Sequence, residues 1–325
     1  MVSVYHAKNG KYSLFAQLKQ IDFPQIVLEI ELPMVYNGNT HFLQRKDLCF
    51  MKKIRDFSRR SPVWFSVALT LLIILIHEIL SSLYALLPDS TGLRIAYELL
   101  FIAWPAALVV LFGFSFIFRQ KGLRATLRAG MPLLLLYGIT LFGQIAKLKM
   151  DPSVEWTSGA KTVLGVIMLI GVGFREEVMF RGIACNAIAR KYAHSIKGIW
   201  FTAIVSGAVF GALHMGNLFH GVNLQGALIQ SFGAFGTGIL FCAIYLRGGN
   251  IWVMALIHSL INAAAAVDML FADIGTFASA INGVNSYSEL IFLFADILMA
   301  AYLLRKSKRQ KILDRMQKLR DEILL

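Results

Sequence analysis

Apolar runs of membrane-spanning length dominate this sequence, and they constrain its fold more than any other feature. A helix needs about 20 apolar residues, at 1.5 Å per residue, to cross roughly 30 Å of hydrocarbon. The mean hydropathy of the chain is +0.63, and only 16% of its 325 residues are charged, whereas soluble domains are about one-quarter charged. The predicted fold is therefore all-α, a polytopic membrane helix bundle of about eight transmembrane helices.

The eight predicted spans divide the chain into three regions. The spans cover approximately residues 63–87, 95–118, 130–146, 161–184, 199–219, 226–246, 251–270 and 288–304. We predict a polar N-terminal extension at 1–50, the transmembrane bundle at 51–304 and a basic cytosolic tail at 305–325. Because a basic leader begins at Met51, we hypothesise that residues 1–50 are dispensable. The tail is either an amphipathic helix on the membrane surface or a solvated helix.

The placement of lysine and arginine predicts the orientation of the chain. With an even number of spans, the basic segments before the first span, after the second and after the last fall on one side. The sequence thus predicts a multi-pass membrane protein with both termini in the cytosol, and the basic leader at Met51 suggests the bacterial cytoplasmic membrane. The net charge of +13 indicates contact with anionic lipid at these segments. It does not indicate nucleic acid, because no basic stripe is interleaved with surface aromatics.

The fourth predicted span contains charges that are unfavourable in lipid. Arg175, Glu176, Glu177 and Arg181 would each cost about 2.5–3.5 kcal/mol near the bilayer centre. They must face the bundle interior, a water-filled cavity or the interface. Glu177 and Arg181 are four residues apart and are expected to pair on one helix face, which leaves Glu176 as the freer carboxylate. The alternative interpretation is a salt-bridge cluster where this span ends early.

Two later spans add further polar residues. Phe210 and His214 share a helix face in the fifth span, beside small residues that let another helix approach closely. His258 and Asn262 point the same way in the seventh span. Each motif also has an ordinary explanation, either a hydrogen-bonded histidine at a helix end or a hydrogen bond between helices.

The combination of these residues suggests hydrolytic chemistry. Two histidines and one glutamate form a ligand set that suits a catalytic zinc with an open position. A glutamate and a histidine also suffice to activate water without a metal. A further pair, His77-Glu78, begins like the zinc motif HExxH, but Ser81 stands at its fifth position. We interpret this pair as structural or as a weak supporting candidate, and we assign His220 to a loop without a role.

The three motifs, in this order, resemble those of the CAAX prenyl protease and bacteriocin-processing family of intramembrane proteases. That family shows EExxxR, then FxxxH, then HxxxN or a similar small polar residue. The matching segments here are Glu176-Glu177-Val-Met-Phe-Arg181, Phe210-Gly-Ala-Leu-His214 and His258-Ser-Leu-Ile-Asn262. The resemblance covers about residues 160–270, which it implies to be the protease core.

The resemblance implies a role for each matching position. Glu176 would be the main catalytic carboxylate, polarising water or binding a metal, and His214 would assist it. His258 and Asn262 would complete the site as metal ligands or as oxyanion donors. The implied cofactor is Zn²⁺ held by Glu176, His214 and His258, with a metal-free glutamate mechanism as the alternative.

The resemblance also implies supporting residues and a function. Glu177 and Arg181 would hold the catalytic site in shape, with Phe210 as further support. The predicted function is an intramembrane endopeptidase that cleaves a membrane-associated substrate, either prenylated or of the bacteriocin type.

Two other functions stay open. One is a non-proteolytic immunity or scaffold protein, against which every motif position carries a chemically competent residue. The other is a proton-coupled transporter, against which the sequence shows no inverted repeat and no paired broken helices.

A depth estimate raises one difficulty for a shared site. At 1.5 Å per residue, Glu176 and His258 lie about 10 Å from the cytosolic face and His214 lies about 10 Å deeper. The three residues meet only if the fifth span starts later than residue 199 or tilts strongly, and tilts of about 20° are ordinary.

Overall fold

The computed structural model describes residues 41–86, 88, 90–119, 122–272, 274–283 and 286–324. Most of the predicted extension at 1–50 therefore lies outside the described residues, and its dispensability stays a prediction. The chain from Asp47 onward forms one compact unit. The helix that precedes the first apolar run continues across Met51, from His41 to Arg60.

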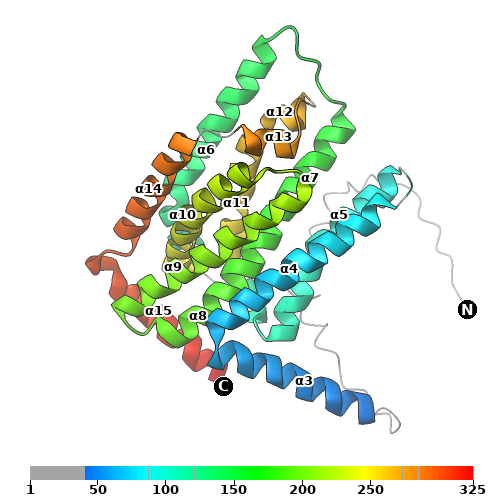
Figure 1. The fold of residues 1–325 in the computed structure, drawn as a ribbon. Coiled ribbons are helices and arrows are strands. Elements are labelled where there is room, and N and C mark those ends of the chain that lie inside the picture. The colour runs from blue at the N-terminus through cyan, green and yellow to red at the C-terminus, as the bar shows by residue number, and fades with distance from the viewer. Residues whose placement is uncertain are drawn as a thin grey trace, which may run out of the picture. The chain divides into compact units, whose positions relative to one another are not determined.

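All regular structure in the described residues is helical (Figure 1). The elements are α3 (His41–Arg60), α4 (Pro62–Ala85), α5 (Thr91–Phe112), the 3₁₀-helix η1 (Ser115–Arg119), α6 (Leu123–Met150), α7 (Gly159–Glu177), the π-helix η2 (Val178–Cys185), α8 (Asn186–Tyr192), α9 (Ile196–Leu213), the 3₁₀-helix η3 (His214–His220), α10 (Leu224–Gly248), α11 (Ile251–Ala265), α12 (Val267–Phe271), α13 (Phe277–Asn282), α14 (Ser286–Leu303) and α15 (Lys306–Leu324). Every predicted span corresponds to one or two of these helices.

Five of the described helices are long and apolar enough to cross a membrane. They are Pro62–Ala85, Gly92–Phe112, Leu123–Met150, Ile196–His220 and Leu224–Gly248. The predicted all-α membrane bundle is thus confirmed. Three of the eight predicted spans, however, are not among the helices that are long and apolar enough to cross a membrane. Of these, α7 ends in a charged cluster and α11 is only 15 residues long. The third is α14, which is not among those helices either.

The four helices that carry or surround the predicted site each begin at a capping side chain. Ser158, Ser195, Asn223 and Asn250 accept a hydrogen bond from a backbone N–H in the first turn of α7, α9, α10 and α11, respectively. Such caps satisfy backbone donors that have no partner within the helix. The start of each site helix is therefore set by local sequence.

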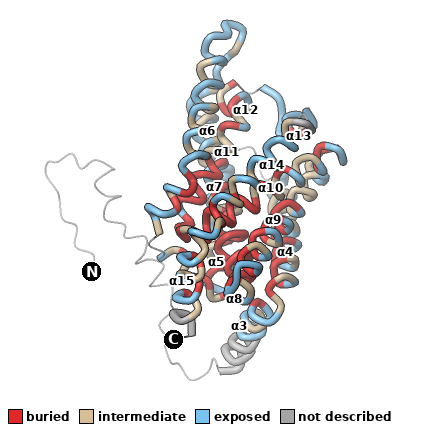
Figure 2. The backbone as a smooth tube through the Cα atoms, turned by 90° about the vertical axis from the view of Figure 1, so that its left-hand side faces the viewer, coloured by how far each residue is buried: buried red, intermediate tan, exposed pale blue. Residues whose placement is uncertain are grey.

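Glycine lets α9 and α10 approach closely at the centre of the bundle. A Cβ atom on Gly238 of α10 would lie 2.7 Å from the Cα atom of Gly207 in α9, and one on Gly211 would lie 2.7 Å from the carbonyl oxygen of Ser231. The close approach expected from small residues in the fifth span is therefore present. Figure 2 shows the buried residues gathered around this region and the junction of α7 with α8.

The basic tail packs on protein through an apolar stripe. Ile312, Met316 and Leu319 of α15 are buried, and their spacing places them on one helix face. Arg315 donates hydrogen bonds to the carbonyl oxygens of Tyr245 (3.0 Å) and Leu246 (3.1 Å) near the end of α10. The tail is thus helical as expected, but its apolar face covers the bundle.

Candidate active site

The charged motif lies where α7 widens into the π-helix η2. All eight residues of η2 are buried, and π-helical turns are frequent at functional sites. The Asn186 side-chain amide donates hydrogen bonds to the carbonyl oxygens of Arg181 (3.0 Å) and Gly182 (2.8 Å) and to the Tyr245 hydroxyl (2.9 Å). The widened turn is therefore held by side-chain hydrogen bonds.

Glu177 and Arg181 form a fully buried ion pair. Arg181 Nη1 lies 2.9 Å from Glu177 Oε1, and both side chains are 0% exposed. The Arg181 guanidinium also lies over two aromatic rings, 4.3 Å from the centroid of Phe210 and 4.9 Å from that of Phe241. Cation–π contacts of this kind stabilise a desolvated guanidinium. The ion pair and the two aromatic rings therefore hold the Arg181 side chain in place.

His258 of α11 completes this arrangement from a helix distant in sequence. Its Nδ1 atom lies 2.8 Å from Glu177 Oε1, and its Nε2 atom lies 3.7 Å from Glu176 Oε2. Because Glu177 is paired with Arg181 as a carboxylate, we assign the donated proton to Nδ1 of His258. The Nε2 atom therefore faces Glu176 with its lone pair.

A glycine brings α7 and α11 close enough for this contact. A Cβ atom on Gly173 would lie 2.8 Å from the backbone nitrogen of Ser259 and 3.1 Å from the carbonyl oxygen of Ala255. Real side chains do not fit at such distances, so only glycine allows this crossing. Gly173 lies one turn before Glu177, and Ser259 follows His258. The close crossing of α7 and α11 therefore sets the distance between Glu177 and His258.

Glu176 is the more accessible of the two adjacent carboxylates. Its side chain is 13% exposed, and the nearest cation is Arg175, whose Nη2 atom lies 4.0 Å from Glu176 Oε1. The Arg175 guanidinium itself lies over the ring of Phe101, 3.9 Å from the centroid. Glu176 thus keeps a carboxylate oxygen toward His258 while Glu177 is buried in structural contacts.

His214 joins the cluster across the ring of Phe210. The Phe210 ring centroid is 5.0 Å from that of His214 and 5.9 Å from that of His258. Nδ1 of His214 lies 3.0 Å from the Phe210 carbonyl oxygen, so this nitrogen donates and Nε2 is left for a substrate. Glu176 acts electrostatically on His214. The two motif histidines therefore flank one aromatic ring beside Glu176.

The position of Asn262 relative to the other motif residues is known from its place on α11. It lies one turn after His258 on α11 and is half-buried. Among the contacts of the described residues, none joins its side-chain amide to Glu176, His214 or His258. Its predicted part in the site therefore depends on its position on the helix.

The helical segment that contains the fourth predicted span is longer than the span itself, which changes the relative depth of Glu176 and His214. The helix does not end near residue 184 but continues through η2 and α8 to Tyr192, and α9 begins soon afterwards at Ile196. At about 1.5 Å per residue, Glu176 lies about 24 Å before that connection and His214 about 27 Å after it. The two residues therefore reach similar depths.

A compact group of potential metal ligands lies outside the three motifs. In the described part of the chain, the residues whose ligand atoms all lie within 4.8 Å of one another are His77, Glu78 and His220. The donor atoms of Glu176, His214 and His258 do not converge to that degree. This set does not fit a bound ion as placed, and zinc at these three residues stays a prediction.

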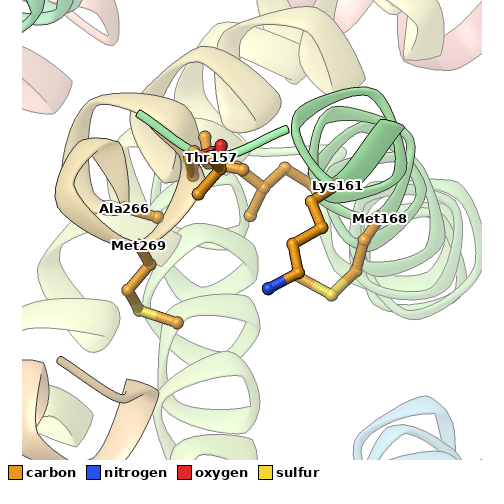
Figure 3. Close-up of a pocket in the computed structure, with 8 residues that line it drawn as sticks. Thr157, Lys161, Met168, Ala266 and Met269 are labelled. Atoms are coloured by element: carbon orange, nitrogen blue, oxygen red, sulfur yellow. The ribbon is translucent and has the colours of Figure 1, made fainter. Parts of the chain in front are cut away.

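A cavity beside α7 is also separate from the motif residues. It has a volume of about 150 Å³ and lies between α7 and α12 (Figure 3). Lys161 and Met168 point into it from α7, facing Met269. Lys161 lies fifteen residues before Glu176, about 22 Å along the helix. This cavity is therefore not the proposed site of catalysis.

Sequence reasoning missed several residues that shape the site. Phe241 lies against both Arg181 and His258, with its ring centroid 5.5 Å from that of His258. Asn186 and Tyr245 hold the widened turn. None of them belongs to a motif, because an aromatic or amide residue in a membrane helix has no distinctive spacing. The only available signal was Asn186 itself, a polar residue in an otherwise apolar stretch.

Comparison with known proteins agrees with the motif order. Residues 158–264 match the family model described as type II CAAX prenyl endopeptidase Rce1-like. No curated protein and no solved structure matches the chain. The matched segment contains all three motifs and runs from the start of α7 almost to the end of α11. The match confirms the recognised resemblance: residues 158–264 carry an Rce1-like domain, which supports assignment to the CAAX prenyl protease and bacteriocin-processing family.

Proposed function

We propose that this protein is an intramembrane endopeptidase that hydrolyses a peptide bond through a water activated by Glu176. The family match supports a CAAX-type protease in general terms. The observation that supports this chemistry best is the difference in burial and contacts between the adjacent carboxylates Glu176 and Glu177. Glu177 is fully buried and its Oε1 atom contacts Arg181 and His258, while the more exposed Glu176 has its Oε2 atom 3.7 Å from His258 Nε2.

The first step is attack of water on the scissile carbonyl. A separation of 3.7 Å between Glu176 Oε2 and His258 Nε2 is too long for a direct hydrogen bond, and it suits a water held between the two side chains. Glu176 accepts one proton of this water as the oxygen–carbon bond forms. His258 accepts a hydrogen bond from the other proton, which orients the oxygen lone pair toward the substrate.

The second step is collapse of the tetrahedral intermediate. The carbon–nitrogen bond breaks, and Glu176 returns its proton to the departing amine. Asn262 has an amide donor that suits the oxyanion, and Nε2 of His214 is the atom available to assist at the reacting centre. The chain's own residues therefore provide a complete cycle of proton transfer without a step at a metal.

We propose a membrane-associated peptide or protein as the substrate, with a prenylated tail or a bacteriocin-type peptide as the two classes to test. The apolar helices around the site suit a substrate that arrives from the bilayer. From the placement of lysine and arginine, we place both termini in the cytosol and the basic segments against anionic lipid. From the basic leader at Met51, we infer a bacterial membrane.

A panel of membrane-anchored and prenylated peptides tests this function. We expect purified wild-type protein to cleave at least one peptide and Glu176→Gln to lose at least about 10²-fold in rate. His214→Ala is expected to lose activity as well. The matched control is Glu155→Gln, which changes an exposed carboxylate in the connection before α7 and is expected to keep the wild-type rate. Undiminished cleavage by both site variants would refute the assignment.

A further inference from the structure

We propose a divalent-metal site, of a type that zinc favours, formed by His77 and Glu78 of α4 and by His220 at the end of η3. The ligand atoms of these three residues all lie within 4.8 Å of one another. His220 Nε2 is 2.9 Å from Glu78 Oε1. The rings of His77 and His220 are perpendicular, with centroids 4.9 Å apart.

The donor set has the chemistry of an open zinc site. Two imidazole nitrogens and one carboxylate oxygen are the ligands of several catalytic zinc centres, where water or substrate takes the fourth position. Ligands at about 2.0–2.2 Å around a tetrahedral ion are about 3.4 Å apart. The longest separation, at most 4.8 Å, needs to contract by at most about 1.4 Å to reach that spacing, and the 2.9 Å between His220 Nε2 and Glu78 Oε1 needs to widen by about 0.5 Å. Small side-chain rotations provide both changes.

Tertiary packing creates this grouping. Neighbours in a helix point about 100° apart, so His77 and Glu78 do not converge by themselves. They can bind a common ion where another element supplies a donor close to both, and η3 places His220 there. The ring of His77 is backed by Phe101, with a centroid distance of 5.2 Å. This contact holds the imidazole toward His220.

An ion can reach these donors. The side chains of His220 and Glu78 are 29% and 33% exposed, so neither is sealed in the core. The alternative role is an ion pair that only fastens α4 to η3. That role needs His220 and Glu78 but gives no function to His77, which the metal site uses as its third ligand.

The site is separate from Glu176, but it is linked to the catalytic cluster. His214 and His220 are the first and last residues of η3, so an ion held at His220 restrains the element that positions His214. His77 is also within electrostatic reach of Glu176 and Arg175. Metal bound here would therefore order the catalytic site without touching the reacting atoms.

Metal binding to the full-length protein tests this inference. The protein is purified with its affinity tag removed, stripped of metal with a chelator and titrated with Zn²⁺ by calorimetry. Co²⁺ is used in parallel, because a tetrahedral site with nitrogen and oxygen ligands gives a visible absorption band. We expect one equivalent per chain, with affinity at least tenfold weaker in His220→Gln, Glu78→Gln and His77→Gln.

Two controls locate the ion. His194→Gln changes an exposed histidine after α8 and is expected to bind as wild type does. His214→Gln reports on the predicted catalytic ligand set and is also expected to keep the ion. The amide introduced by His220→Gln can still hydrogen bond to Glu78, and thermal unfolding checks that each variant is folded.

Two results would overturn the proposal. One is a wild-type protein that binds no more Zn²⁺ than His220→Gln. The other is binding that is lost in His214→Gln but kept in His220→Gln, which would place the ion at the catalytic cluster. Because the readout is bound metal, either result is independent of whether the protein cleaves peptides.

Discussion

At the scale of single residues, the site depends on one buried carboxylate oxygen that has two partners. Glu177 Oε1 is 2.9 Å from Arg181 Nη1 and 2.8 Å from His258 Nδ1. Removing one partner of a buried pair leaves an uncompensated charge, which costs about 3–5 kcal/mol. Glu177 is therefore expected to act mainly as a positioning residue, which leaves Glu176 free for chemistry.

Arg181→Lys tests the planar contacts of the buried guanidinium. A lysine keeps the positive charge, but it cannot stack as a plane between Phe210 and Phe241. We expect a loss of about 2 kcal/mol or more, typical of a desolvated cation–π contact. Thermal unfolding of purified protein measures this change. The control Arg124→Lys changes an exposed arginine of α6, and equal stability of the two variants would contradict the prediction.

Glu177→Gln separates positioning from catalysis at the neighbouring carboxylate. We expect this variant to lose stability because the Arg181 charge is left without its partner. Glu176→Gln is expected to keep the unfolding temperature of the wild type and to lose proteolysis. Measuring unfolding and peptide cleavage on both variants decides the assignment. The reverse pattern would exchange the roles of the two glutamates.

At the scale of elements, the distance between α7 and α11 governs the site. Gly173 allows the crossing that brings His258 to Glu177, because a Cβ atom there would be 2.8 Å from a backbone nitrogen. The π-helix η2 has a similar role, since it places Arg181 against the rings of Phe210 and Phe241. Helix crossing and helix widening together bring three motifs into one site.

Gly173→Ala tests the helix crossing. The added methyl group forces α11 away, and overpacking of this kind costs about 1–3 kcal/mol. We expect proteolysis to fall more than stability, because His258 moves from Glu177. Gly159→Ala is a matched control on the same helix, where a Cβ atom meets nothing within 4 Å. Similar activity in the two variants would show that the crossing does not set the site.

Asn186→Ala tests the widened turn. This change removes hydrogen bonds to two backbone carbonyls and to the Tyr245 hydroxyl. Leaving buried polar groups unsatisfied costs about 1–3 kcal/mol, so we expect a lower unfolding temperature. Tyr245→Phe removes only one of these bonds and is expected to cost less. If the tyrosine variant is the less stable, the turn is held in another way.

At the scale of the whole molecule, the apolar helices and the family domain define an integral membrane protein. The domain match begins at residue 158, whereas the bundle already begins with α4. Part of α3 also supports the bundle, since Ile54 packs against the core. The bundle therefore includes chain segments well outside the matched domain.

A chain that starts at Met51 tests the predicted extent of the protein. It keeps Ile54 and the basic leader, so we expect it to insert into membranes and to retain wild-type proteolysis. Membrane fractionation and the peptide panel measure both properties. A chain that starts at Ser61 lacks these features and serves as the comparison. Loss of insertion or activity in the Met51 chain would show that the preceding residues are required.

The sequence by itself determined the features that depend on local order. Apolar length predicts membrane helices, spacing of four residues predicts the Glu177–Arg181 pair, and motif order identifies the family. How far a helix continues beyond its apolar run was not predicted, because a polar residue such as Asn186 can continue a helix when its amide is satisfied. Such satisfaction depends on contacts that an isolated segment does not have.

Only the tertiary structure decided which distant residues meet. His258 reaches Glu177 because a glycine allows two helices to cross closely. His220, which the sequence places in a loop without a role, meets His77 and Glu78 because η3 lies against α4. Sequence separation does not specify these distances. They follow from how closely helix surfaces pack, and that depends on the side chains of both partners at every crossing.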